Sequence, residues 1–293
     1  MEGVPLVTAP RTRFNLPLPH RQALVLGPRT LVMGILNVTP DSFAGGVADP
    51  DRAADLALQM EADGADIIDI GGESTRPGAD PVSEADELAR VMPVIDRLRG
   101  RLGVPMSIDT YKAAVASAAI RAGASIVNDI SGLGYDPGLG DVVAGNGAGL
   151  VLMHMRGRPR DMYLEAAYVD VVAEVSAELQ QALERADAAR VPRTQVILDP
   201  GIGFAKRADQ SRAVLADLAR LAQLGRPLLV GPSRKSFLTD GQAPLPPADR
   251  DWGTAAAVTV AVMGGAHIVR VHRVAAMVQV VRTADALRAA ARA

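Results

Sequence analysis

From residue 31 onward, short runs rich in β-branched residues or leucine alternate with Ala-rich amphipathic segments, and this repeated alternation restricts the fold more than any other feature. The pattern predicts parallel strands joined by helices. The expected strands are 31–36, 66–70, 105–108, 125–127, 149–153, 195–198, 227–230 and 266–271. The expected helices lie near 51–63, 83–100, 112–122, 138–146, 168–189, 208–223, 251–264 and 274–291. Eight of each favour an α/β fold of the (β/α)8 TIM-barrel type over an open sheet.

The length of the chain is compatible with one such barrel. Although 293 residues would suffice for two average domains, α/β barrels commonly reach this size as one domain, and no interdomain linker stands out. We therefore expect one barrel over residues 31–293, preceded by an N-terminal extension over residues 1–30. Within the extension, residues 21–26 are expected to form a short strand or hairpin that plugs the bottom of the barrel.

The composition excludes several classes of function. A formal net charge of −2 gives no reason to expect a nucleic-acid partner. The absence of cysteine excludes disulfides, thiolate catalysis and Cys-ligated zinc, and it is compatible with a reducing cytoplasm, where we expect the protein to act. Residues 1–22 lack the apolar core of a signal peptide. The longest apolar stretch, 255–266, is shorter than the roughly 20 residues that span a bilayer, so no membrane partner is expected.

Polar and Gly-rich residues gather after the expected strands, whereas the segments before the strands are plainer. Gly-Ala pairs at 64–65, 123–124 and 147–148 are typical of helix C-caps that lead into a strand. In a (β/α) barrel the segments after the strands share one face, which is where such enzymes carry out their chemistry. The asymmetry therefore predicts one composite site.

One group of polar residues directly follows apolar strands and should project into a pocket of low dielectric constant. Its members are Asp109, Asn128, Asp199 and Lys235. Because buried, unpaired carboxylates are costly, they need partners. Lys235 could bridge two of the aspartates in a structural network, or a ligand rich in N–H donors could bind them. The four together favour a heterocycle with amidine-like edges.

A second group is basic and hydroxyl-rich, and it comprises the segments 74–76 and 233–234 with Arg270 and His272. Arg270 and His272 lie two residues apart at the end of the last strand, so they face the same side. Cations that converge with Ser and Thr hydroxyls suit a phosphate or pyrophosphate. The alternatives are a salt bridge from Arg270 to a neighbouring helix and a purely structural role for His272. Asn37 closes the first strand, where its amide oxygen could bind a hard divalent cation that also holds phosphate oxygens.

Lysine is rare in this chain, which uses only Lys112, Lys206 and Lys235 among its 31 basic residues. Where lysine is kept against this bias, a compact point charge is indicated rather than a planar guanidinium. Two of the three lie in Gly-rich turns, and the turn at 231–237 suits an anion, although an ordinary loop with a solvated charge is the alternative. His154 stands alone between two methionines and is interpreted as structural.

Seven segments in order resemble the motif series of the dihydropteroate synthase family and together cover residues 31–275. They are Asn37-Val-Thr-Pro-Asp-Ser-Phe43, Gly72-Glu-Ser-Thr-Arg-Pro-Gly78, Ser107-Ile-Asp-Thr110, Asn128-Asp-Ile-Ser-Gly132, Leu198-Asp-Pro-Gly-Ile-Gly-Phe204, Gly231-Pro-Ser-Arg-Lys-Ser236 and Arg270-Val-His272. The resemblance implies a homodimeric transferase of folate biosynthesis and a sulfonamide target. It would join 6-hydroxymethyl-7,8-dihydropterin pyrophosphate to p-aminobenzoate, with release of pyrophosphate and 7,8-dihydropteroate.

The resemblance also implies roles for individual residues. The pterin would be bound by Asp109, Asn128, Asp199 and Lys235, with Met153 and Phe204 as apolar neighbours. Pyrophosphate and Mg²⁺ would be bound by Asn37, Arg270 and His272, with Asn37 as the metal ligand and with help from Thr75 and Arg76. The p-aminobenzoate would lie among Phe43, Thr75, Arg76, Pro77, Phe204, Lys235 and Ser236. The residues closest to the chemistry would be Lys235, Asp199, Asp109, Arg270 and His272.

Two departures from the family pattern leave alternatives open. The first loop reads Ser42-Phe-Ala-Gly-Gly46, which is shorter than the usual Ser-Phe-Ser-Asp-Gly-Gly and lacks its acid, and Arg273 follows His272 where an Asp is usual. A non-catalytic pterin-binding homologue is therefore the second hypothesis. A pterin-dependent methyltransferase domain is the third, and the segment 74–77 and the Arg-x-His pair argue against it because its substrate carries no pyrophosphate. The small-residue helix 253–265 is suited to packing against a second subunit or against its own barrel.

Overall fold

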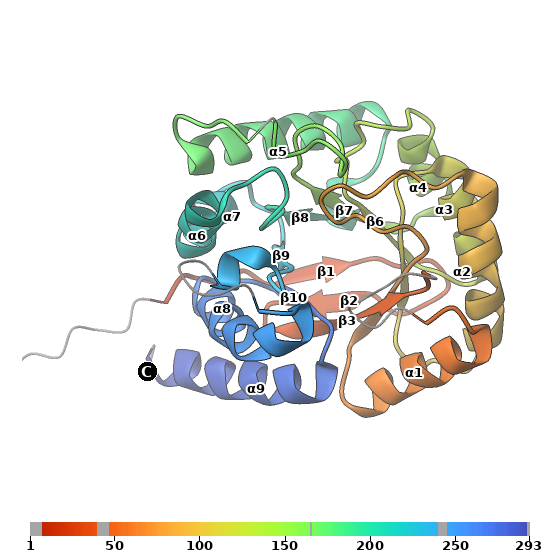
Figure 1. Cartoon of the computed structure of the whole chain (residues 1–293), viewed down its shortest axis with the longest axis horizontal. Coiled ribbons are helices and arrows are strands. Elements are labelled where there is room, and N and C mark those ends of the chain that lie inside the picture. The colour runs from red at the N-terminus through yellow and green to blue at the C-terminus, as the bar shows by residue number, and fades with distance from the viewer. Residues whose placement is uncertain (1–7, 40–46, 165, 240–244, 292–293) are drawn as a thin grey trace, which may run out of the picture.

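The computed structural model describes residues 8–39, 47–164, 166–239 and 245–291. Its main body is an eight-stranded parallel sheet with helices around it (Figure 1). The strands are β3 (Leu31–Asn37), β4 (Ile67–Gly71), β5 (Met106–Asp109), β6 (Ile126–Asp129), β7 (Gly149–Met153), β8 (Val196–Asp199), β9 (Leu229–Val230) and β10 (Ile268–Val271). The helices are α1 (Pro50–Ala62), α2 (Glu84–Leu98), α3 (Ala113–Ala122), α4 (Leu139–Asn146), α5 (Val171–Ala188), α6 (Ala208–Ala216), α7 (Leu218–Ala222), α8 (Asp251–Met263) and α9 (Val274–Ala290).

The sheet closes on itself, which confirms the predicted barrel. Hydrogen-bonded neighbours run in the order β8-β7-β6-β5-β4-β3-β10-β9. A parallel bridge between Leu198 and Leu228 then joins β8 to the segment that precedes β9, and the Leu198 amide donates to the Pro227 carbonyl at 2.9 Å. All segments that follow the strands therefore meet at one end of the barrel.

Two predicted elements differ in detail from those observed. The strand expected at 227–230 has regular pairing only over Leu229–Val230, because Pro227 has no N–H to donate to a ladder. The helix expected at 208–223 divides into α6 and α7 at Asp217, whose backbone leaves the helical region at φ −120° and ψ 44°. Aspartate favours helix ends over helix interiors, because its side chain competes for backbone N–H groups.

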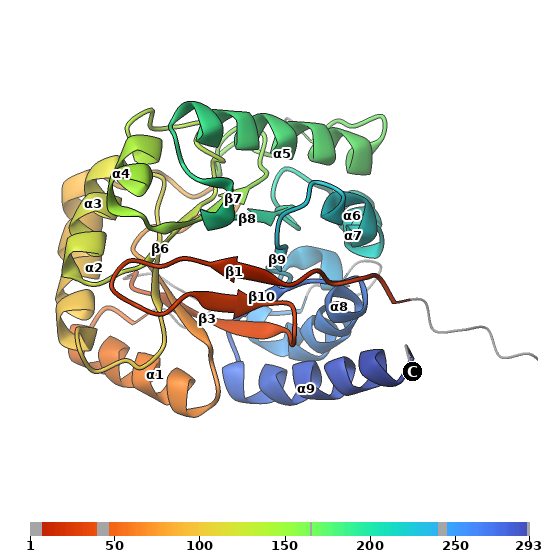
Figure 2. The same cartoon turned by 180° about the vertical axis from the view of Figure 1, so that it is seen from behind.

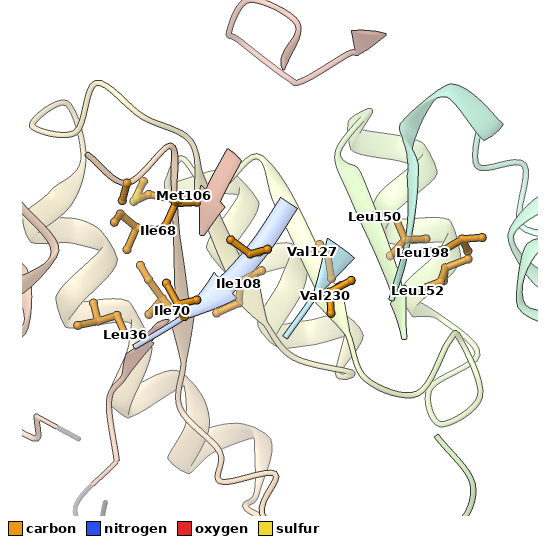
Figure 3. Close-up of a cluster of buried hydrophobic side chains, with 14 of the residues drawn as sticks. Leu36, Ile68, Ile70, Met106, Ile108, Val127, Leu150, Leu152, Leu198 and Val230 are labelled. Atoms are coloured by element: carbon orange, nitrogen blue, oxygen red, sulfur yellow. The ribbon is translucent and has the colours of Figure 1, made fainter. Parts of the chain in front are cut away.

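The main hydrophobic core lies between the strands and the surrounding helices. Outward-facing strand residues such as Leu36, Ile68, Ile70 and Ile108 are fully or almost fully buried there (Figure 3). Most strand residues are apolar on both faces, as expected for a parallel sheet that is covered by helices outside and packed inside. The expected helix C-caps are present, since Gly123 and Gly147 adopt positive φ angles of 119° and 64°.

A hairpin lies at the barrel bottom, and the predicted segment 21–26 supplies only its second strand. Strands β1 (Phe14–Leu16) and β2 (Leu24–Leu26) pair antiparallel and lie across the barrel in the view from behind (Figure 2). Leu16, Leu18 and Leu26 pack against inward-facing residues at the amino ends of the strands, including Met33 and Ile126. The end opposite the predicted site is thereby sealed. Within the described residues, no helix has the length and apolar character that a membrane crossing needs.

Candidate active site

A cleft of about 590 Å³ opens at the carboxyl ends of the strands. Its walls come from the segments that follow β3, β4, β5, β7, β8, β9 and β10. It is lined by ten of the predicted site residues, namely Asn37, Thr75, Arg76, Pro77, Asp109, Phe204, Lys235, Ser236, Arg270 and His272. Asn128, Met153 and Asp199 do not line it but are buried nearby, and Phe43 lies outside the described residues. The segments therefore converge as the strand–helix pattern predicts.

Arg270 connects three strands across the floor of this cleft. Its Nε donates to Asp69 Oδ2 at 2.6 Å, and its Nη2 donates to Asp109 Oδ2 at 2.5 Å. The Asn128 amide also donates to Asp69 Oδ2, at 3.0 Å. Arg270 thus forms a salt bridge with strand carboxylates, whereas the sequence suggested a helix as the alternative partner.

The two carboxylates share one guanidinium, and for Asp109 burial at this site outweighs the attraction of that cation. Burial raises the pKa of Asp109 to about 7, with a further contribution from Asp69, although Arg270 opposes the rise. Burial also acts against the charge of Arg270, but Asp69 and Asp109 outweigh it and raise the pKa of the guanidinium. Arg270 stays charged, while Asp109 can accept or donate a hydrogen bond near neutral pH.

Asp199 and Lys235 lie on either side of the turn that follows β8. Asp199 Oδ1 accepts from the Gly201 amide at 2.7 Å. Lys235 Nζ donates to the Ile202 carbonyl and lies 3.8 Å from the centre of the Phe204 ring. Burial lowers the pKa of Lys235 to about 7, even though Asp199 opposes the shift, and burial raises the pKa of Asp199. The predicted alternative in which Lys235 bridges two aspartates is not the arrangement found.

Glycine is required in this turn because other chain atoms approach it closely. Gly201 has φ +64°, and a Cβ atom there would lie 2.0 Å from the His154 carbonyl oxygen. Gly203 has φ +78°, and a Cβ atom there would lie 2.7 Å from Lys235 Cδ. The lysine stem therefore packs directly on the turn, which fixes the ammonium beside Phe204.

His272 is held as a neutral side chain at the opposite wall. Its backbone N–H donates to Ser233 Oγ at 3.3 Å, and its Nδ1 lies 2.9 Å from the same oxygen. The hydroxyl can therefore donate to Nδ1, which assigns the ring proton to Nε2. Burial and the nearby arginines Arg234, Arg270 and Arg76 lower the pKa of His272 to about 3. His272 is thus a hydrogen-bond donor rather than a cation.

Arg273, where the sequence departs from the expected pattern, follows His272 but does not line the cleft. Its Nη1 is 3.5 Å from Asp251 Oδ2, and Asp251 Oδ1 accepts from Arg234 Nε at 2.8 Å. Asp251 at the start of α8 therefore serves as the acidic partner of both arginines. Arg234 therefore has a carboxylate partner although position 273 carries a positive charge.

The loop that carries Thr75 and Arg76 is anchored by a buried ion-pair cluster that the sequence did not reveal. Lys112 Nζ donates to the carboxylates of both Glu73 and Glu87, and the Tyr111 hydroxyl donates to Glu73 at 2.8 Å. The scarcity of lysine was the sequence feature that could have indicated a special role for Lys112.

Sequence reasoning also missed Asp69. The feature that could have indicated it is a single acidic residue inside the apolar run Ile67–Gly71.

A wall residue that no motif indicated is Tyr163, in the segment between β7 and α5. It lines the cleft, and its hydroxyl lies 3.5 Å from the Gly203 carbonyl oxygen. The same segment reaches the β4–α2 loop, where the Gly78 amide donates to the Pro159 carbonyl at 3.0 Å. Two loops that are far apart in sequence thus join over the cleft.

The fold and the cleft define a (β/α)8-barrel enzyme with its active site at the carboxyl ends of the strands. A model of the family described as pterin binding enzyme matches residues 33–272, which is nearly the whole barrel. The class of protein is therefore a pterin-binding barrel enzyme.

Comparisons over the full chain narrow this class. The chain is 48% identical to the dihydropteroate synthase of Synechocystis sp. over 277 residues, covering 94% of this chain and 96% of that protein. It superimposes on the Yersinia pestis dihydropteroate synthase, solved as a sulfonamide drug complex, with a TM-score of 0.89 and 42% identity over 94% of this chain and 100% of the other. The Burkholderia cenocepacia synthase complexed with 7,8-dihydropteroate gives a TM-score of 0.85 and 44% identity over 95% and 98%. The chain belongs to the dihydropteroate synthase family, a family of transferases.

Replacing Arg270 tests the charge balance of the cleft floor. Arg270→Met leaves the Asp69 and Asp109 carboxylates without their shared cation, so we expect the free energy of unfolding at pH 8 to fall by about 3–5 kcal/mol. The pKa of Asp109, which burial already raises, rises further in this variant, so the folded state binds protons more readily than the unfolded state. The deficit should therefore shrink between pH 8 and pH 5.5 in urea titrations.

The matched control is the double variant Asp109→Asn with Arg270→Met, which removes one of the two stranded charges. It should recover part of the lost stability at pH 8. An equal deficit for Arg270→Met at both pH values would contradict the assigned charge balance.

Proposed function

We propose that this chain condenses 6-hydroxymethyl-7,8-dihydropterin pyrophosphate with p-aminobenzoate to give 7,8-dihydropteroate and pyrophosphate. One observation supports this most strongly: a floor of buried carboxylates adjoins a cationic, hydroxyl-rich rim inside a single cleft. A heterocycle with N–H donors and an anionic leaving group require these two environments side by side. The cysteine-free sequence is compatible with our further proposal that the reaction takes place in the cytoplasm.

The pterin end of the substrate is assigned to the floor. Asp109 and Asp199 are suited to bind ring N–H and exocyclic amine groups, and Asn128 adds an amide. Lys235, beside the Phe204 ring, would meet a ring acceptor. Met153 packs in the same small cluster as Tyr111 and Phe204, which gives the ring an apolar neighbour.

The pyrophosphate end is assigned to the rim. Arg76 supplies positive charge at the rim and Arg270 supplies it from the adjoining floor, the Thr75 hydroxyl adds a donor, and the neutral His272 donates through Nε2. The p-aminobenzoate is assigned to the outer cleft. That part is lined by Thr75, Arg76, Pro77, Phe204, Lys235 and Ser236, while the predicted Phe43 lies outside the described residues.

The proposed reaction needs no protein nucleophile. The C–O bond at the pterin methylene breaks, and its electron pair leaves with pyrophosphate, whose negative charge the rim stabilises. The electron-rich ring carries the developing positive charge, which the nearby carboxylates Asp109 and Asp199 favour. The lone pair of the arylamine then forms the C–N bond, and the nitrogen releases its proton to solvent or to pyrophosphate.

Mg²⁺ is proposed to bind together with the pyrophosphate. Among the described residues, no cluster of three or more His, Cys, Asp or Glu side chains is arranged to hold a metal alone. The amide of Asn37 lines the cleft as a hard oxygen donor, in a rim rich in cations that would repel a lone dication. This set fits a metal held mainly by substrate phosphates and water, which is how Mg²⁺ is commonly bound. When bound, the metal supplies further positive charge to the leaving oxygens.

The assay that tests the proposed function is metal-dependent formation of dihydropteroate, detected by mass spectrometry, from both substrates. In this assay Lys235→Ala should lower kcat/KM by about 100-fold, because the loss removes a charge-assisted hydrogen bond in a desolvated site. Arg121→Ala removes an exposed cation on α3 and should leave activity unchanged. Near-normal turnover by Lys235→Ala would refute its role, and no product from the unaltered chain would refute the function and favour a non-catalytic pterin-binding homologue.

The role of Asn37 is tested by titrating the metal. Asn37→Ala should raise the Mg²⁺ concentration for half-maximal activity by about tenfold, because the only proposed protein ligand is lost. Asn15→Ala, on the exposed side of the hairpin, is the control and should titrate like the unaltered chain. An unchanged titration for Asn37→Ala would exclude it as a ligand.

A homodimer is proposed on the face formed by α8 and α9. Trp252 and Val260, eight residues apart on α8, are 88% and 45% exposed, and Leu287 on α9 is 55% exposed. Residues at this spacing share one helix face, and an exposed apolar face with a tryptophan is typical of an interface. We expect a second copy of the chain to cover it.

Light scattering should give about twice the chain mass of 30.6 kDa for the unaltered protein. Val260→Glu should give the monomer mass, because an unpaired charge is costly in a desolvated interface. Val169→Glu, at a fully exposed valine outside this face, is the control and should remain dimeric. A monomer for the unaltered chain would disprove the proposal.

A further inference from the structure

Lys206 is a fully buried lysine that does not line the cleft. Its side chain is 1% exposed, and it ends the turn between β8 and α6. Its Nζ lies 2.7 Å from His154 Nδ1, 3.1 Å from the Gly201 carbonyl oxygen and 3.1 Å from the Phe204 carbonyl oxygen. An ammonium has three N–H donors, and three acceptors surround this one. Burial lowers the pKa of Lys206, and the Asp199 carboxylate opposes the shift.

His154 transmits this interaction to α5. Because Nδ1 faces an ammonium, it acts as the acceptor, so the ring proton lies on Nε2 and is donated to Glu178 Oε2 at 2.9 Å. Glu178 Oε1 also accepts from Arg156 Nε at 2.9 Å. Burial, together with the charge of Lys206, lowers the pKa of His154 to about 4, so the imidazole is neutral. A chain of hydrogen bonds thus connects the turn to α5, one of the helices that surround the strands.

The turn itself is wound around two lysine ammoniums. Lys235 Nζ donates to the Ile202 carbonyl, and Lys206 Nζ donates to the carbonyls of Gly201 and Phe204. Ala205 has φ +46°, a left-handed conformation that costs about 1–2 kcal/mol for a residue with a Cβ atom. The turn also has a backbone hydrogen bond from the Phe204 amide to the Gly201 carbonyl at 3.0 Å, and the two lysines add three further donors to its carbonyl groups, which offsets the cost of the strained alanine.

We propose that Lys206 is a positioning residue for the pterin end of the cleft. Its ammonium donates to carbonyl groups of the 201–206 backbone. These hydrogen bonds hold Asp199, Phe204 and the Ile202 carbonyl, which accepts from Lys235, in position. This inference rests on the proposed function, since it concerns the same substrate. The chain retains Lys206 although 28 of its 31 basic residues are arginine, the remaining three being lysine, and a compact point charge is what three converging acceptors require.

The first measurement separates KM from kcat. Lys206→Met keeps the length of the side chain and removes every donor, so we expect KM for the pterin pyrophosphate to rise at least about tenfold while kcat falls less than about threefold. The reason is that the turn binds the ring, whereas the opposite rim stabilises the leaving group. A merely structural role would lower kcat through loss of folded enzyme and leave KM unchanged.

Two further variants sharpen this comparison. Lys206→Gln keeps two N–H donors and should give a KM between those of the unaltered chain and Lys206→Met. Arg207→Met removes a neighbouring exposed cation from the same turn and should leave both constants unchanged. If Lys206→Met does not fold, Lys206→Gln is judged by the same criteria. A KM for Lys206→Met equal to that of the unaltered chain overturns the proposal.

The second measurement needs no substrate and separates this inference from the proposed function. Hydrogen exchange of the 201–206 amides should be faster in Lys206→Met than in the unaltered chain, with β5 and β6 unchanged. Calorimetry with 6-hydroxymethylpterin shows whether the unaltered chain binds a pterin at all, and no binding would refute the proposed function alone. Unchanged exchange in the turn would overturn the role of Lys206 whatever the calorimetry gives.

Discussion

The pairing of one guanidinium with two buried carboxylates is the interaction on which the mouth of the barrel depends. Arg270 comes from the last strand, and its partners Asp69 and Asp109 lie 201 and 161 residues earlier in the chain. β10 pairs with β3, and the curvature of the barrel brings Arg270 within reach of β4 and β5. The cleft floor therefore combines residues from strands that are far apart in the sequence, and the cost of burying three charges is offset by their mutual geometry.

Each of the three lysines holds a loop at the cleft end of the barrel. Lys112 anchors the loop of Thr75 and Arg76 through Glu73 and Glu87, and Lys206 gathers the turn after β8. Lys235 reaches from the next loop onto that turn. The ammonium groups of Lys112 and Lys206 each meet acceptors that converge from several directions, which a planar guanidinium cannot satisfy equally well. Arginine is used where two parallel hydrogen bonds bind one carboxylate, as Arg234 Nε and Nη2 bind Asp251.

The sequence predicted the fold well because the pattern that encodes it is local. Apolar runs and Gly-terminated amphipathic segments set the strands and helices, and polar residues after strands such as Asp109 and Lys235 must share one face of a barrel. The partners of those residues were not predictable in the same way. Which carboxylate meets Arg270 depends on the stagger of strands around the barrel, so Asp69 inside a strand was missed. The partner of Lys235 proved to be the Ile202 carbonyl, because the turn curls back under the lysine stem.

The electrostatics of the cleft follow from this construction. Burial brings the pKa values of Asp109 and Lys235 to about 7 from opposite directions, so an acid and a base both change charge easily near neutral pH. An arriving anion favours the charged lysine, and ring N–H donors favour the charged carboxylate, so a substrate that carries both would favour the charged forms of Lys235 and Asp109. His272 is already neutral and gains nothing from this exchange. The charged Arg270, beside an acid and a base that can change charge near neutral pH, thus suits a ligand that is anionic at one end and rich in N–H donors at the other.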